Sequence, residues 1–126
     1  MDERLRKSLL YDFYGELLTE HQKAVFSAAI FDDMSYSELA EEFDCSRQAA
    51  FDLVRRINKK LENYELKLGL LERFTNAKDK MEELSKAVSD MNSSVEASVI
   101  DDKTKRKLLK DISGIYDMST QIFEEL

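Results

Sequence analysis

The amino-terminal third of the chain carries apolar residues every three to four positions, the spacing of one face of an α-helix. The first such segment spans about residues 3–18, and its apolar positions are Leu9, Leu10, Phe13, Tyr14 and Leu17. Thr19 and Gln22 then form a T-x-x-Q capping box, which predicts a second helix that continues to about Phe31. The apolar positions of that helix are Val25, Phe26, Ala29 and Ile30. We expect both helices to be amphipathic, with the aromatic residues of this region in a shared core, including Phe31.

A second capping box marks the start of a shorter helix. Ser35 and Glu38 form an S-x-x-E pattern, and the helix that it predicts covers about residues 36–42 and buries Leu39. The next three residues, Phe43-Asp44-Cys45, predict a tight turn in which Cys45 packs as a small hydrophobic residue. Asp44 lies where the turn needs a left-handed backbone, which aspartate tolerates better than most residues.

Ser46 is the expected N-cap of a long helix that begins at Arg47. Its apolar positions are Ala50, Leu53, Val54, Ile57, Leu61, Tyr64, Leu68 and Leu71. From Ile57 onward they alternate in steps of four and three, which is a heptad pattern. Gly69 interrupts this helix at a cost of about 1 kcal/mol relative to alanine. The sequence therefore predicts a break or kink within residues 69–75.

The carboxy-terminal part contains a second heptad run and a last helix. The run consists of Phe74, Ala77, Met81, Leu84, Val88, Met91 and Val95. It is out of phase with the first run, so the two cannot share one straight seam. We expect a loop at Asn92-Ser93-Ser94 and a last helix over about residues 103–123. The predicted domains are a helix-turn-helix domain over residues 1–73 and a helical extension or dimerisation hairpin over residues 74–126.

Composition supports an all-α fold and excludes several classes of protein. The chain of 126 residues has no proline and three glycines, too few for the frequent turns of an all-β domain. One cysteine and one histidine allow neither an internal disulfide nor a Cys-based zinc site. The sequence has no phosphate-binding loop and no hydrolase or metalloprotease signature. We therefore expect no enzymatic activity, no catalytic residues, no metal and no cofactor.

Hydropathy favours a soluble, cytoplasmic protein. The longest apolar stretch, residues 24–31, is far shorter than the roughly 18 residues that a membrane span needs. The first fifteen residues contain no uninterrupted apolar run of the kind found in signal peptides. We expect no membrane span and no secretory signal.

Residues 36–55 fit a helix-turn-helix motif, in which the second helix recognises nucleic acid. With the apolar side of that helix buried, Arg47, Gln48, Phe51, Asp52 and Arg55 are expected to face outward. Arg47 and Gln48 suit hydrogen bonding to base edges, and Phe51 suits contact with a thymine methyl or stacking on an unpaired base.

Basic residues farther along the same helix suit phosphate contacts; they are Arg55, Arg56, Lys59 and Lys60. The sequence also permits two purely structural interpretations. Asp52 and Arg56 are four residues apart and could simply pair, and Phe51 could pack against the amino-terminal helix. The formal net charge of −7 argues against general adhesion to nucleic acid, so binding through this local basic face is expected to be weak.

Three segments also resemble a known family. LLTEHQ (17–22), FDDMSYSELAEEFDCSRQAAFD (31–52) and LENYELKLGLLERF (61–74) are similar to YlxM-type helix-turn-helix proteins. The resemblance covers about residues 8–74. It implies a fold related to region 4 of bacterial sigma factors and a role in modulating the signal recognition particle pathway, through the particle's RNA and GTPases. It implies nothing for residues 75–126.

Three functional hypotheses follow. In the first, the chain is a regulator that binds signal recognition particle RNA, with particle proteins as further partners. In the second, it is a DNA-binding transcription regulator that uses the same helix. In the third, it is a protein-interaction scaffold that binds no nucleic acid. A homodimer through the carboxy-terminal heptad faces is expected, because these faces are too apolar for an isolated helix. Residues 103–110, KTKRKLLK, form a second basic cluster whose role the sequence leaves open.

Overall fold

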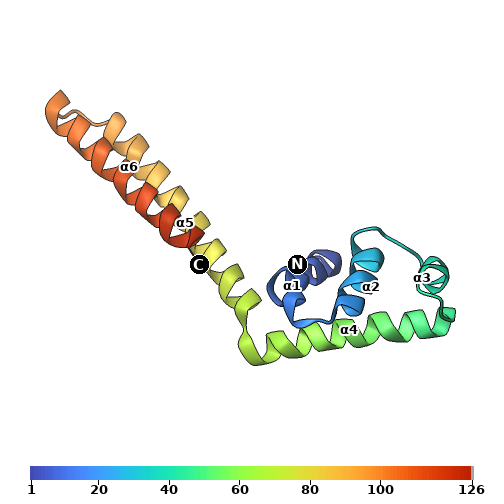
Figure 1. Cartoon of the computed structure of the whole chain (residues 1–126). Helices are drawn as coiled ribbons and strands as arrows, with labels where there is room; N and C mark the ends of the chain where they lie inside the picture. The colour runs from blue at the N-terminus through green and yellow to red at the C-terminus, as the bar shows by residue number, and fades with distance from the viewer. Residues whose placement is uncertain (126) are drawn as a thin grey trace. The chain divides into compact units, whose positions relative to one another are not determined.

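The computed structural model describes residues 1–125, which form helices and no strands (Figure 1). The elements are α1 (Glu3–Tyr14), the 3-10 turn η1 (Gly15–Leu17), α2 (Glu20–Ile30), α3 (Tyr36–Glu42), α4 (Arg47–Leu68), α5 (Leu70–Glu96) and α6 (Asp102–Glu124). The all-α prediction is confirmed. The chain divides into two compact units, Met1–Glu72 and Arg73–Leu126.

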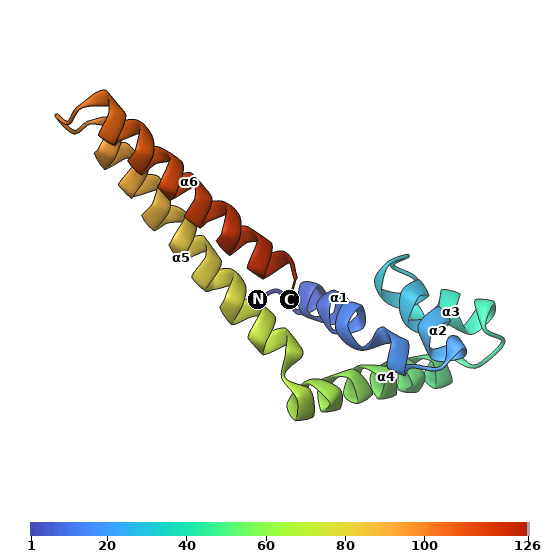
Figure 2. The same cartoon turned by 60° about the vertical axis from the view of Figure 1, so that its left-hand side comes forward.

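In the first unit, α1, α2 and α3 pack on one side of α4 (Figures 1 and 2). The core contains residues from all four helices, and its largest fully buried side chains are Tyr14, Phe26, Leu10, Leu39, Ile57, Leu61, Leu71 and Val25. The buried positions of α4 follow helical spacing: Ala50, Val54, Ile57 and Leu61. Because they form one line along α4, the opposite face of this helix is turned to solvent.

The predicted helix starts are confirmed in atomic detail. Both capping boxes are complete, with Thr19 paired to Gln22 and Ser35 paired to Glu38. The Ser46 hydroxyl accepts a hydrogen bond of 3.0 Å from the Ala49 N–H at the start of α4. Asp44 has the expected left-handed backbone, with φ of 52°. These local interactions define the turn between α3 and α4 without any contact from distant parts of the chain.

The predicted break also occurs, and a partly buried cluster of hydrogen bonds stabilises it. Gly69 ends α4 in a left-handed conformation, with φ of 64°, which glycine adopts without strain. The Tyr14 hydroxyl donates to Glu65 Oε1 at 2.6 Å and accepts from the Leu70 N–H at 3.1 Å. The Glu65 carboxylate accepts from the Leu71 N–H at 2.8 Å and the Glu72 N–H at 3.1 Å. Tyr14 and Glu65 thus satisfy the first three backbone donors of α5, which a new helix leaves unpaired.

An ion pair joins α1 to α4 close to Glu65. Arg6 Nε and Nη2 donate to the two carboxylate oxygens of Glu62, at 2.8 and 2.7 Å. The bidentate geometry is the favourable one for guanidinium and carboxylate. The hydrogen bond from Arg6 lowers the pKa of Glu62 below its usual range, against the opposing effect of burial.

The second unit is a hairpin in which α5 and α6 run antiparallel, side by side in both views (Figures 1 and 2). Phe74 and Phe123 stack at its open end, with ring centroids 5.8 Å apart. Val88 and Ile112 are its buried residues within the described chain. At the closed end, the Asp101 carboxylate accepts from the Thr104 N–H at 3.1 Å and caps α6.

The loop predicted at Asn92-Ser93-Ser94 is wrong, because α5 continues to Glu96 and the turn lies after it. The segment contains no glycine or proline to end the helix, and the Asn92 amide donates along the helix to Glu96 at 3.5 Å. The helix ends at Glu96, whose backbone carbonyl has no partner within α5. Lys105 Nζ of α6 donates a hydrogen bond of 3.0 Å to this carbonyl.

Four other side-chain placements in the first unit differ from the sequence expectation. Leu17 and Leu68 are exposed, Phe31 is half exposed, and Cys45 is exposed in its turn. The 3-10 turn changes the rotation per residue after α1, so that Leu18 is buried in place of Leu17. Phe31 follows the last turn of α2, and its ring meets the ring of Tyr11 edge-on, with 5.4 Å between centroids.

Candidate nucleic-acid interface

The motif α3–turn–α4 has the geometry of a helix-turn-helix. The turn is closed by the Phe43 N–H donating to the Leu39 carbonyl and the Cys45 N–H donating to the Ala40 carbonyl, both at 2.9 Å. Leu39 on α3 and Ala50 on α4 are both buried in the common core. The small Ala50 side chain leaves room for the two helices to approach. The first half of α4 therefore presents its outer face beside the turn.

The outer face of α4 carries one line of polar residues, which we call the outer stripe: Gln48, Asp52, Arg55, Arg56 and Lys59. Gln48, Asp52, Arg55 and Lys59 follow each other in steps of four, three and four, so they lie opposite the buried line. The last four residues of the stripe line a surface hollow of about 350 Å³. Arg55, Arg56 and Lys59 are exposed and form no ion pair or hydrogen bond with any group in residues 1–125. Their charges remain available to an anionic partner.

Asp52 is the acidic member of the outer stripe, and Gln48 is its hydrogen-bond partner. Gln48 Nε2 donates to Asp52 Oδ1 at 3.2 Å. The alternative pairing of Asp52 with Arg56 is not among the ion pairs of residues 1–125, so the guanidinium stays unpaired. Part of the Gln48 amide is therefore already engaged within the helix, and a negative charge lies between the cations.

Phe51 and Tyr36 form an exposed aromatic pair beside the outer stripe. Their rings meet edge to face, with centroids 5.2 Å apart and an interplanar angle of 79°. Each side chain is more than one-third exposed. The recorded ring contact of Phe51 is thus with α3, not with the amino-terminal helix. Tyr36 was not predicted as a site residue, and its only signal in the sequence is a large aromatic residue at the first position of a short helix.

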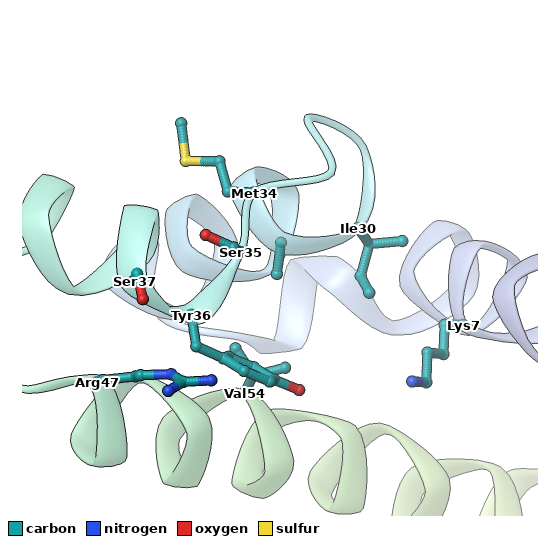
Figure 3. Close-up of a pocket in the computed structure, with 9 residues that line it drawn as sticks. Lys7, Ile30, Met34, Ser35, Tyr36, Ser37, Arg47 and Val54 are labelled. Atoms are coloured by element: carbon teal, nitrogen blue, oxygen red, sulfur yellow. The ribbon is translucent and has the colours of Figure 1, made fainter.

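A pocket of about 400 Å³ lies on the Tyr36 side of α4 (Figure 3). It is lined by Lys7, Ala29, Ile30, Met34, Ser35, Tyr36, Ser37, Arg47 and Val54. Figure 3 shows the Tyr36 ring over Val54, with the Arg47 side chain reaching toward it from one end and Lys7 at the other. Arg47 is exposed as predicted, but it belongs to this pocket instead of the outer stripe. The pocket combines two cations with an aromatic wall.

The seven predicted site residues therefore fall into three groups. Gln48, Arg55, Arg56 and Lys59 lie together on the outer stripe. Arg47 and Phe51 lie with Tyr36 on the flank that faces α3. Lys60 lies on the other flank, where its Nζ donates to Gln22 Oε1 of α2 at 3.3 Å. One helix thus presents two basic surfaces, and Lys60 is engaged in a hydrogen bond between α4 and α2.

Within residues 1–125, no group of three or more His, Cys, Asp or Glu side chains is placed to hold a metal ion. No helix in this part of the chain has the length and hydropathy to cross a membrane.

Comparison with known proteins identifies one family. Residues 1–112 match the family UPF0122, described as "Putative helix-turn-helix protein, YlxM / p13 like". A UPF0122 protein of Shouchella clausii is 46% identical over 103 residues, which cover 80% of this chain and 94% of that protein. One from Halalkalibacterium halodurans is 44% identical over 96 residues, covering 76% and 88%. One from Clostridium kluyveri is 38% identical over 112 residues, covering 89% and 100%.

Proposed function

Because the chain belongs to the UPF0122 family of YlxM/p13-like helix-turn-helix proteins, we propose that it is a regulatory protein that binds nucleic acid. One observation carries the proposal: Arg55, Arg56 and Lys59 are exposed and unpaired on the second helix of the motif. The resemblance to YlxM-type proteins and to sigma factor region 4 supports a finer assignment. In it, the protein is cytoplasmic and modulates the signal recognition particle pathway, with the particle's RNA and proteins as partners.

The binding mechanism is electrostatic and local. Exposed arginine and lysine side chains neutralise phosphates and release condensed counterions, so affinity falls steeply with salt. The rest of the first unit opposes this attraction, because α3 and the turn expose Glu38, Glu41, Glu42 and Asp44. Asp52 adds a negative charge within the outer stripe itself. We infer weak binding that depends on orientation, which suits a regulator that binds and releases its ligand.

The placement of the side chains favours RNA over duplex DNA as the ligand. Reading base edges in the major groove of DNA would use Arg47 and Gln48. Arg47 lies toward the Tyr36 pocket, however, and the Gln48 amide donates to Asp52. RNA recognition relies instead on phosphates and on stacking of unpaired bases against aromatic side chains. The outer stripe and the Tyr36–Phe51 pair supply these two elements side by side.

Removing two cations from the outer stripe is expected to lower the salt dependence of RNA binding. In the double variant Arg55→Ala/Lys59→Ala, the slope of log affinity against log salt should fall by about 1.4–1.8, since each phosphate contact contributes about 0.7–0.9. Thermal stability should hardly change, because both side chains are exposed and unpaired. The measurement is a titration of signal recognition particle RNA, and of duplex DNA, at several salt concentrations.

The matched control removes two positive charges from α5, outside the outer stripe. Lys78 and Lys80 are exposed on α5, and Lys78→Ala/Lys80→Ala changes the net charge by the same two units. This control should keep the parent slope. If the outer-stripe variant binds both ligands as the parent does, the stripe is not a phosphate-binding surface, and a protein-interaction scaffold becomes the better account.

Replacing Phe51 by alanine is expected to weaken binding to RNA with unpaired bases by about 1–3 kcal/mol, the contribution of stacking one base on an aromatic side chain. Binding to fully paired duplexes should change little, because their bases are not accessible for stacking. The measurement compares a hairpin RNA with an open loop and a blunt duplex of similar length. An equal loss for both ligands would assign Phe51 a structural role through Tyr36.

A further inference from the structure

The α5–α6 hairpin leaves an apolar line uncovered on α6. Leu108, Ile115 and Ile122 recur every seven residues, so they follow one line along the helix. Their exposed fractions are 39%, 47% and 65%, and Met118 beside them is 61% exposed. The hairpin buries Val88 and Ile112. Two helices alone thus hide only part of the apolar surface that their sequences carry.

We propose that a second copy of this chain covers this line, with the two α6 helices antiparallel across a two-fold axis at Ile115. In a two-fold interface the same patch occurs on both partners, so a residue at the axis meets its own copy. The line Leu108–Ile115–Ile122 is symmetric about its middle member. Ile115 then packs on Ile115 of the second copy, and Leu108 packs on Ile122 at both ends.

The charges on α6 fit this arrangement and oppose the parallel one. Residues 103–110 carry five basic side chains and no acidic one, whereas Asp117, Glu124 and Glu125 lie toward the other end. Antiparallel pairing brings the basic half of one helix beside the acidic end of the other. Parallel pairing would bring like charges together, which is repulsive. This pairing also compensates for cations at the amino-terminal end of α6, where the helix dipole disfavours them.

The two hairpins together would form a four-helix bundle, the arrangement that buries such faces.

The family match ends at residue 112, so most of this line lies beyond it. The inference therefore concerns this chain and is independent of nucleic-acid binding by α4.

The first test compares oligomeric state in three full-length proteins by sedimentation or light scattering at micromolar concentrations. The parent should have twice the chain mass of 14.7 kDa. Ile115→Asp should weaken association by about 100-fold or more, because it places two unpaired carboxylates at the axis. Ser113→Asp is the control: Ser113 is exposed and two positions away, which places it on the opposite side of α6, so its dimer should persist.

Circular dichroism separates loss of the interface from loss of the hairpin. Ile115 is half exposed within its own chain, so Ile115→Asp should keep the helical signal of the parent. A parent protein that is monomeric up to about 100 μM would overturn the proposal. It would also be overturned if the Ile115→Asp and Ser113→Asp proteins had the same oligomeric state.

Crosslinking tests the register and direction. Single cysteines are introduced at Leu108, Ile115 or Ile122 in a Cys45→Ser background, because Cys45 is exposed, and treated with a short bifunctional maleimide. Ile115→Cys should crosslink to its own copy. Leu108→Cys and Ile122→Cys should each crosslink poorly alone but efficiently when the two proteins are mixed. Efficient crosslinking of Leu108→Cys to itself would indicate a parallel pair and contradict the proposed arrangement.

Discussion

Leu39→Ala is expected to lower the free energy of unfolding of the first unit by about 2–5 kcal/mol, the range for leucine-to-alanine changes in a packed core. Leu39 is 1% exposed and is the buried residue of α3. Its loss removes the main apolar contact that holds this short helix against α4 and leaves a cavity. Urea or thermal unfolding followed by circular dichroism measures the effect.

Two leucines on α4 provide graded controls for this prediction. Leu53 is only partly buried, so Leu53→Ala should cost less than Leu39→Ala. Leu66 is 85% exposed, and Leu66→Ala should cost almost nothing. If Leu39→Ala were no more destabilising than Leu66→Ala, the packing of α3 on α4 described here would be wrong.

Glu65→Leu is expected to destabilise the first unit by about 2–4 kcal/mol, because it leaves at least two buried or half-buried hydrogen-bond donors without an acceptor. The Tyr14 hydroxyl and the Leu71 N–H both donate to this carboxylate, and both residues are buried. The substitution keeps the apolar bulk of the side chain, so the loss reports the hydrogen bonds. Unfolding in urea near neutral pH measures it.

Glu65→Gln is the isosteric test, and it should change the pH dependence of stability. Burial raises the pKa of Glu65, but hydrogen bonds from Tyr14, Leu71 and Glu72 lower it more, so its pKa lies below the usual 4.5. A carboxylate whose pKa is lower in the folded state stabilises the fold at pH above its unfolded pKa. This contribution is lost as pH falls through the folded value. The parent should therefore lose more stability than Glu65→Gln between neutral pH and about pH 3.

Other carboxylates also contribute to the loss of stability at acid pH. The pKa values of Glu62 and Glu38 are also lowered, by hydrogen bonds from Arg6 and at the Ser35 cap, so some acid sensitivity should remain in Glu65→Gln. Glu72→Gln is the matched control, since its side chain is exposed on the next helix. If Glu65→Gln and Glu72→Gln showed the same acid sensitivity, Glu65 would not act as the cap of α5.

Much of the candidate site follows from short-range patterns. Arg55 and Lys59 were predicted to face outward because Ala50, Val54 and Ile57 occupy the buried side of the same helix, and the structure places them so. The same rule could not assign the flanks of α4. A side chain at the edge between the buried and exposed faces of α4 is either exposed or bonded to another helix, and the outcome depends on which helix packs beside it.

Arg47 and Lys60 illustrate this limit. Both are basic residues of one helix and look equivalent in the sequence. In the structure, Arg47 lines a pocket with Tyr36 of α3, and Lys60 donates to Gln22 of α2, 38 residues away. Whether Asp52 pairs with Gln48 or Arg56 is similarly a choice between two neighbours at helical spacing, and the sequence permits both.

By itself, the sequence determined the helices of the first unit, their capped starts, the break at Gly69 and the outward line of cations on α4. Each of these depends on side chains within about one helical turn, or on the separation of apolar from polar faces. Only the tertiary structure decided that Tyr14 and Glu65, 51 residues apart, cap α5 together, and that Tyr36 joins Phe51. The physical reason is that such partners meet only when separate helices pack, and hydrophobic periodicity specifies which face is buried but not which residue lies opposite it.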